Sequence, residues 1–255
     1  MNYYLTLILL LWVYFSSFFI LSIFKKRNDI VDIAWGIGFI LASWSSLFLS
    51  SNYSPKHLLV SLLITLWGLR LALHIYSRNR NKKEDYRYLA WRKEWGKNFY
   101  LRSYLQIYML QALLLFLVVS PVLILNHSVS VDFNSFDILA LSIWLFGFIF
   151  EAVSDYQLSL FIKKSENKGK IVQSGLWRYS RHPNYFGEVT LWWGIFLFAF
   201  SSTLNPLTLI GPLTITILIL FVSGIPLLEK KYDHNPQYLE YRKKTSIFFP
   251  LPPKT

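Results

Sequence analysis

The stretch YYLTLILLLWVYFSSFFILSIF, residues 3–24, contains no charged side chain and is long enough to cross a lipid bilayer. A membrane-spanning α-helix needs about 20 mainly apolar residues, since each residue advances the helix by about 1.5 Å. The run has no basic start and is longer than the apolar core of a typical signal peptide. It therefore predicts a first transmembrane helix rather than a secretory signal.

Further apolar runs of similar length follow at residues 30–50, 57–76, 104–125, 136–160, 185–203 and 207–228. The composition agrees, with 54% hydrophobic residues, 18% aromatic residues and a mean hydropathy of +0.36. These runs leave no room for a separate soluble domain. The sequence predicts an all-α, polytopic integral membrane protein with about seven transmembrane helices, built as one membrane-embedded domain over residues 1–255.

The basic residues are distributed unequally between the two sides of these spans. The 26 Lys and Arg exceed the 14 Asp and Glu, which leaves a net charge of +12. Apart from Lys56, in an outer loop, and Arg70, inside the third span, the other 24 of the 26 fall on one side. Because basic loops stay in the cytosol, the N-terminus is predicted outside and the C-terminus cytosolic. In a bacterium this membrane is the inner, or plasma, membrane.

The charge and composition also bear on ligands and partners. Short basic loops between apolar spans argue against a nucleic-acid partner and favour membrane lipid. The same surplus also suits a cytosolic cofactor that carries phosphate groups. The chain has no cysteine and 5 histidines, which argues against disulfides and thiolate metal sites, so no metal site is predicted.

Several ionisable residues lie within the predicted spans, where charges are costly and mark a function or a buried pair. Asp32 lies near the start of the second span, where it either caps the helix or approaches a ligand. Arg78 ends a stripe of polar residues on the third span, which either extends to the cytosolic surface or faces a ligand. Glu151 and Asp155 are one helical turn apart, which suits an ion pair with Arg70, a hydrogen bond to a ligand, or a proton path.

The densest polar feature is GLWRYSRHPNYFGE, residues 175–188, directly before an apolar run. Pro183 is suited to the first position of a helix, because its missing N–H costs nothing there. The free amides of that helix start predict an anion-binding site together with the side chains of Arg178, Arg181 and His182. One turn further in, Asn184 and Glu188 share a face, and Tyr185 adjoins Asn184.

This stretch resembles the C-terminal signature of membrane steroid 5-alpha-reductase-like enzymes. The whole chain looks like the bacterial branch described as a domain of unknown function, DUF1295, and the likeness is most specific over residues 150–250, the reductase-like cofactor-binding half. Residues 32–36, DIAWG, and residues 88–96, YLAWRKEWG, are also typical of that branch.

The resemblance extends to a second enzyme class. Isoprenylcysteine carboxyl methyltransferases share the Arg-His-Pro-x-Tyr-x-Gly pattern. In those enzymes the pattern helps to hold S-adenosylmethionine. Asn184 with Glu188 matches the reductase pattern for the nicotinamide end of NADPH, and Asp155 matches an acidic contact on the preceding helix. The resemblance to the reductases implies NADPH as the cofactor. It also implies three further cofactor contacts: Tyr185, Tyr238 and Arg242.

The reaction implied by this likeness is NADPH-dependent reduction of a carbon–carbon double bond in a lipophilic enone, either steroid-like or another lipid. The phosphates would lie among four arginines: Arg78, Arg80, Arg178 and Arg181. Asp32, Glu151 or a tyrosine would serve as the acid at the carbonyl. The Gln-Glu pair and the Tyr that act on the substrate in steroid-reducing members have no match here. Two other hypotheses are a methyltransferase using S-adenosylmethionine and a non-catalytic membrane protein.

Overall fold

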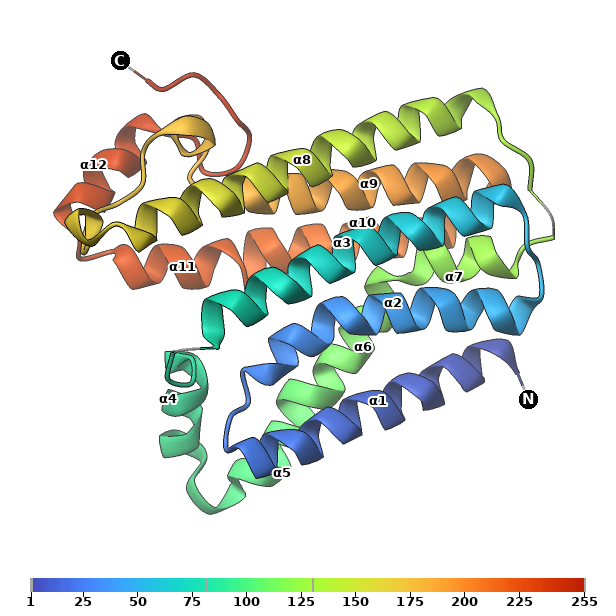
Figure 1. The fold of residues 1–255 in the computed structure, drawn as a ribbon, viewed down its shortest axis with the longest axis horizontal. Helices are drawn as coiled ribbons and strands as arrows, with labels where there is room; N and C mark the ends of the chain where they lie inside the picture. Colours follow the sequence, from blue (N-terminus) through green and yellow to red (C-terminus); the bar gives the residue numbers. More distant parts are fainter. Residues whose placement is uncertain (1, 81, 130, 255) are drawn as a thin grey trace. The chain divides into compact units, whose positions relative to one another are not determined.

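The computed structural model describes residues 2–80, 82–129 and 131–254. Over these residues the regular elements are helices, apart from one isolated parallel β-bridge between Ser180 and Ser246 (Figure 1). The chain divides into two compact units. Unit 1 is Met1–Phe133 with Ser202–Ile210, and unit 2 is Asn134–Ser201 with Gly211–Thr255. The single membrane domain expected from the sequence stays a prediction.

The all-helical membrane fold predicted from the sequence is confirmed. Within the described residues, six helical segments are long and apolar enough to cross a membrane: Tyr3–Lys25, Ile30–Ser50, Pro55–Asn79, Tyr86–Val118, Ser135–Lys163 and Pro206–Tyr232. The predicted span at 185–203 forms helix α9 (Pro183–Thr203), which begins with polar turns and is not among these six. Seven spans and their orientation therefore stay a prediction.

Unit 1 contains the first three long helices and a run of shorter ones. These are α1 (Tyr3–Lys25), α2 (Ile30–Ser50), α3 (Pro55–Asn79), α4 (Tyr86–Trp95), α5 (Phe99–Ser103), the π-helix η2 (Tyr104–Met109), α6 (Leu110–Val118), α7 (Ser120–His127), and the short 3₁₀ turns η1 (Gly96–Asn98) and η5 (Pro206–Leu209). The expected continuous span 104–125 is broken at Val119, because Pro121, the second residue of α7, cannot donate a backbone hydrogen bond to the preceding turn.

Unit 2 contains two long helices and the C-terminal segments. These are α8 (Ser135–Lys163), α9, α10 (Ile210–Ile217), the π-helix η6 (Leu218–Val222), α11 (Ile225–Tyr232), α12 (Pro236–Lys244), and the 3₁₀ turns η3 (Ser165–Asn167) and η4 (Gly175–Arg178). The expected span 207–228 is thus interrupted after η6. A side chain at Gly224 would lie 2.6 Å from the carbonyl oxygen of Ile219, so only glycine fits this break.

Close backbone approaches hold the long helices together within each unit. In unit 1, a Cβ on Gly36 of α2 would lie 2.6 Å from the carbonyl oxygen of Gly68 on α3. In unit 2, a Cβ on Gly187 of α9 would lie 2.5 Å from the backbone nitrogen of Glu151 on α8. Small residues at such crossings let helices pack closely where lipid removes the hydrophobic drive for association.

The long helices present apolar side chains on the face that their unit leaves uncovered. On α3, Leu62, Leu66, Leu69 and Leu73 are exposed at intervals of three or four residues, whereas Trp67 is fully buried. This period places the leucines on one face of the helix. An exposed leucine face of this length is typical of contact with lipid.

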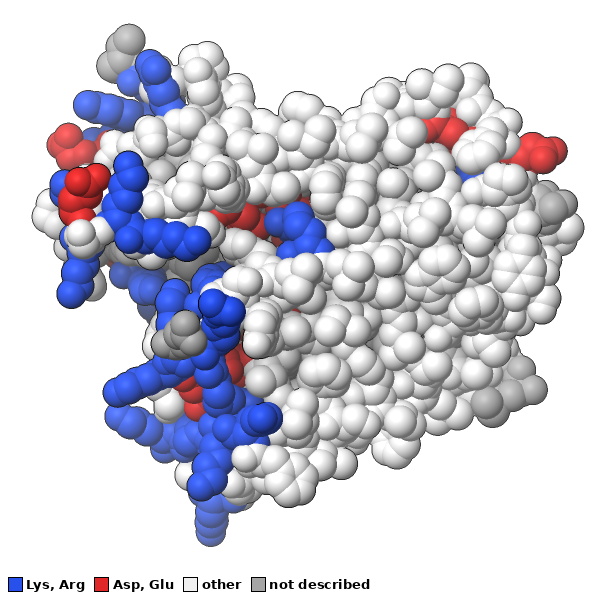
Figure 2. All heavy atoms as spheres, in the orientation of Figure 1, with Lys and Arg blue, Asp and Glu red and all other residues white. Residues whose placement is uncertain are grey.

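Basic side chains gather at particular segments of each unit. Figure 2 shows Lys and Arg over α4 and α5 in unit 1, and over the α12 end of unit 2. The surface that Figure 2 shows over the long helices is mostly uncharged. Within each unit, charge is therefore concentrated beside the helix ends, as expected where a protein meets the polar edge of a membrane.

The Gly187→Ala variant tests the close approach of α8 and α9. We expect it to lower the free energy of unfolding by about 1–3 kcal/mol. The new methyl group meets backbone atoms of α8, which cannot move aside as a flexible side chain does. Thermal unfolding in detergent measures the effect. Val153→Ile, which adds a methyl group at an exposed position of α8, is the control and should leave the melting temperature nearly unchanged. Equal melting temperatures for both variants would contradict this packing.

Candidate functional site

The loop before α9 is fixed on α8 by two hydrogen bonds. The indole Nε1 of Trp177 donates to the carbonyl oxygen of Ser154 at 3.1 Å, and the backbone N–H of Leu176 donates to Gln157 Oε1 at 2.9 Å. Gly175 has a φ of +62°, a conformation that favours glycine, and a side chain there would collide with Gln157. The polar start of α9 is therefore held beside the C-terminal third of α8.

Four residues implied by the resemblance or by their depth in a span come together on α8 and α9. Asn184 Nδ2 donates to Asp155 Oδ1 at 3.2 Å. Asp155 and, one turn earlier, Glu151 are buried, and Glu188 follows Asn184 by one turn of α9. We call Glu151, Asp155, Asn184 and Glu188 the acidic cluster. Its carboxylates suit ligand groups that donate hydrogen bonds, such as hydroxyl, amide and amine groups.

A second cluster, below the first turn of α9, centres on the Glu229 carboxylate of α11. Arg181 donates to it from Nε at 2.8 Å and from Nη2 at 3.2 Å. His182 Nε2 lies 3.0 Å from Glu229 Oε1, and the Tyr238 hydroxyl donates to the same oxygen at 2.6 Å. Glu229, Arg181, His182 and Tyr238 are all buried. Hydrogen bonds to an ionised group of this kind are among the strongest in proteins.

The same arginine binds the C-terminal tail. Arg181 Nη1 donates to the carbonyl oxygens of Arg242 at 3.2 Å and Thr245 at 2.6 Å, and the Arg181 backbone N–H donates to Ser246 at 2.8 Å. Ser180 Oγ donates to the carbonyl of Phe248 at 2.8 Å and accepts from the backbone N–H of His182. The segment before α9, α11 and the tail thus form one connected polar core within unit 2.

Burial and the Glu229 hydrogen bond also affect the tyrosine of α12. Desolvation raises the pKa of the Tyr238 hydroxyl above its ordinary value, and the bond to Glu229 raises it further. The neutral phenol is therefore the stable form at physiological pH, and it acts as a donor to Glu229.

The remaining predicted residues of unit 2 lie nearer the surface. Arg178 is exposed, and the half-exposed side chain of Arg242 lies 3.7 Å from Glu229 and 3.4 Å from Asp233. The Tyr185 ring stacks on His182, with 5.7 Å between ring centroids. The three residues of the expected anion site therefore do not face one ligand position. Arg178 is at the surface, whereas Arg181 and His182 turn inward to Glu229. Their contact with a cofactor stays a prediction.

Two predicted residues, Asp32 and Arg78, lie in unit 1. The Tyr88 hydroxyl donates to Asp32 Oδ1 at 3.0 Å, and Arg87 Nη2 lies 3.7 Å from Asp32 Oδ2. These contacts anchor α4 to the start of α2. Arg78 is exposed at the end of α3 and donates to Asn79.

Asp85, the residue that caps α4, also binds Arg87. Burial acts to raise the pKa of Asp85, but hydrogen bonds from Arg87 outweigh this effect and hold that pKa below its usual value.

Sequence reasoning missed Glu229 and Tyr88. The last predicted span ends at residue 228, which leaves Glu229 outside it, in the charged segment that follows, although Leu227 and Leu228 precede it. A carboxylate that directly continues an apolar run is the signal that identifies it, since such a group needs a buried partner. For Tyr88, the aromatic-rich motif of residues 88–96 indicates only a family resemblance, and nothing in its spacing indicates Asp32 as the partner.

The sequence of most of the chain matches one protein family. The family model for a protein of unknown function, DUF1295, matches residues 18–245. The chain belongs to this family. An uncharacterized protein of Schizosaccharomyces pombe is 29% identical over 263 residues, which cover 90% of this chain and 74% of that protein. No solved structure matches.

A second relative carries the name of an enzyme. The Protein-S-isoprenylcysteine O-methyltransferase of Saccharomyces cerevisiae is 33% identical over 91 residues. The match covers 34% of this chain and 36% of that enzyme. The similarity is therefore limited to about a third of each protein.

The Glu229→Ala variant tests the polar core of unit 2. Removing the carboxylate leaves the buried Arg181 charge without its partner, so we expect unfolding to become easier by about 3–5 kcal/mol. Trypsin should then cleave faster at Lys243 and Lys244 of the loosened tail, as followed by mass spectrometry. The matched control is Glu240→Ala, an exposed carboxylate on α12. If both variants are cleaved at the rate of the unaltered protein, Glu229 does not hold the tail.

Proposed function

We propose that this protein is a membrane enzyme that binds NADPH at the start of α9 and reduces a carbon–carbon double bond in a lipophilic enone. The observation that carries this proposal is the Asn184–Asp155 hydrogen bond, because it joins the two sites that the reductase resemblance implies for the nicotinamide half. We place the protein in a bacterial inner membrane, with the C-terminus in the cytosol where NADPH is present.

The side chains of unit 2 fit the two ends of such a cofactor. The acidic cluster offers acceptors for ribose hydroxyls and for a carboxamide N–H, and Asn184, which uses Nδ2 toward Asp155, retains Oδ1 as a further acceptor. Carboxylates repel phosphate, so the phosphates belong at exposed basic side chains such as Arg178 and Arg242. When bound, NADPH supplies a hydride to the electrophilic carbon of the enone.

The protein supplies the remaining chemistry through proton donation. Hydride addition places negative charge on the enone oxygen, so a donor at that oxygen stabilises the transition state. Glu151 is the preferred candidate, because it is the buried member of the acidic cluster that lies one turn before Asp155 on α8. Asp32 is a weaker candidate, since its contacts with Tyr88 and Arg87 already give it the role of anchoring α4.

A second candidate function is methyl transfer from S-adenosylmethionine to a lipophilic acceptor. Its specific support is the partial similarity to the yeast methyltransferase. The acidic cluster also suits this ligand, because S-adenosylmethionine carries an ammonium and a sulfonium charge that carboxylates attract. The two candidates differ in the phosphates, which only NADPH presents to the basic side chains.

Parallel titrations of the full chain in detergent with NADPH and with S-adenosylmethionine test the proposal. We expect saturable NADPH binding that Asn184→Ala weakens about tenfold, the equivalent of one hydrogen bond to a charged partner. The control Gln173→Ala removes an exposed amide in the same unit and should leave the affinity unchanged. Saturation by S-adenosylmethionine alone would replace the proposal with methyl transfer. No binding of either ligand would favour a non-catalytic protein.

A further inference from the structure

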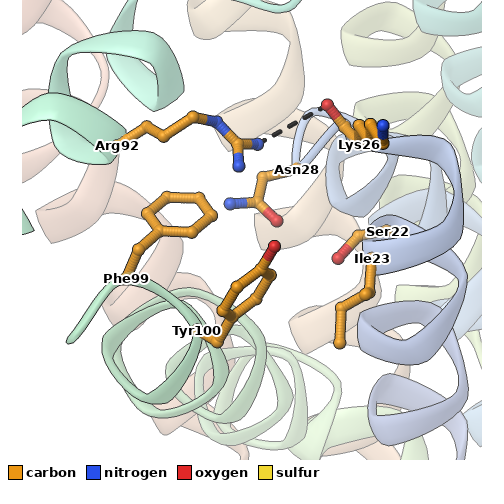
Figure 3. Close-up of a pocket in the computed structure, with 7 residues that line it drawn as sticks. All are labelled: Ser22, Ile23, Lys26, Asn28, Arg92, Phe99 and Tyr100. Atoms are coloured by element: carbon orange, nitrogen blue, oxygen red, sulfur yellow. Dashed lines mark hydrogen bonds between the residues drawn. The ribbon is translucent and has the colours of Figure 1, made fainter. Parts of the chain in front are cut away.

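A small polar pocket in unit 1 lies where the end of α1 meets α4 and α5. The side chains that matter for its chemistry are Ser22, Lys26, Asn28, Arg92, Phe99 and Tyr100. Figure 3 shows the hydroxyls of Ser22 and Tyr100 and the amide of Asn28 turned toward the same space, with the Arg92 guanidinium beside it. Lys26 and Tyr100 are exposed, so the pocket opens at the surface.

The Arg92 guanidinium is held in a fixed orientation at this pocket. Its central carbon lies 4.1 Å from the centroid of the Phe99 ring, a cation–π contact. Its Nη2 lies 3.3 Å from both carboxylate oxygens of Glu84 and 3.5 Å from the carbonyl oxygen of Lys26. Within the described chain, the hydrogen bonds of Arg92 come from Nη2, so Nε and Nη1 are able to donate to a ligand.

The charge at the pocket mouth favours an anion. Lys25 ends α1 and Lys26 caps it, both with exposed side chains. Among the residues that the structure describes, the acidic partner of Arg92 is Glu84, whose side chain is nearly buried. A planar guanidinium, an ammonium and a phenol hydroxyl together match the oxygens of a phosphate group. The ligand chemistry indicated is therefore a phosphate monoester or diester at the mouth, rather than a neutral molecule inside the pocket.

Apolar side chains next to the mouth distinguish the source of that phosphate. Phe24 is 80% exposed, Leu101 63% and Tyr100 54%. They adjoin the end of α1, a candidate membrane span that ends at Lys25, which is the depth at which lipid headgroups lie. A free phosphate makes no use of these side chains, whereas the acyl chains of a lipid do.

We propose that this mouth binds the headgroup phosphate of an anionic phospholipid, with the acyl chains lying along the exposed apolar face of α1. Lys26, Arg92 and the Tyr100 hydroxyl contact the phosphate. The site lies wholly in unit 1 and does not depend on the cofactor proposed for unit 2.

Native mass spectrometry of the detergent-solubilised full chain, titrated with phosphatidylglycerol, tests this site. Lys26→Gln should weaken binding of the tightest lipid about fivefold, as for the loss of one basic group near an anionic lipid. Tyr100→Phe should weaken it about twofold to threefold through loss of one hydroxyl. Both residues are exposed, so neither variant disturbs the fold. The control Lys168→Gln removes one exposed positive charge from unit 2 and should have no effect.

Two outcomes would overturn the proposal. Equal lipid affinities for the unaltered protein, Lys26→Gln and Tyr100→Phe would show that the lipid binds elsewhere. Complete displacement of the lipid by millimolar inorganic phosphate would assign the site to a soluble phosphate instead of a headgroup. Retention of the lipid at that phosphate concentration, together with the two weakened variants, supports the headgroup site.

Discussion

The arrangement of unit 2 depends on the buried Glu229 carboxylate, which accepts hydrogen bonds from Arg181, His182 and Tyr238. These three donors come from the segment before α9 and from α12, which are distant in sequence from each other. Burying an ion pair is costly unless its remaining hydrogen bonds are satisfied. Here Arg181 uses its other N–H groups on carbonyls of the tail, so one ion pair fixes three segments at once.

This polar core determines what the start of α9 is able to do. Arg181 and His182 are turned inward to Glu229, so the charged side chains near the start of α9 are the carboxylates of the acidic cluster, on α8 and α9, and exposed basic residues such as Arg178. A ligand with hydrogen-bond donors at one end and phosphates at the other matches this division. That match is the physical reason why we propose NADPH, rather than S-adenosylmethionine, as the ligand of this member of the DUF1295 family.

Sequence patterns predicted the long helices well and the polar contacts poorly. The spans at 3–24, 30–50 and 136–160 agree with α1, α2 and α8 to within a few residues, because apolar runs between charged ends determine where such helices lie. The breaks at Val119 and Gly224 were missed, since a single proline or glycine in an apolar run is common in membrane helices. Asn184 and Asp155 are implied by resemblance alone; the fold joins them by a hydrogen bond, and their contact with a cofactor stays a prediction.

The partner of Arg181 was beyond prediction for a different reason. The sequence places Glu229 beside Lys230 and Lys231, which makes it look like one charge in a solvated run. Only the fold brings Glu229 under the first turn of α9, 48 residues after Arg181 along the chain. Long-range pairs of this kind depend on tertiary packing, which local composition does not encode.

Hydrogen–deuterium exchange of the Glu229→Gln variant tests the central role of this carboxylate most directly. The Arg181 amide donates to Ser246 and the Leu251 amide donates to Tyr179, so both report whether the tail stays on the segment before α9. We expect faster exchange at these two amides, with unchanged exchange in the middle of α8. Unchanged protection of both amides in the variant would contradict the central role of Glu229.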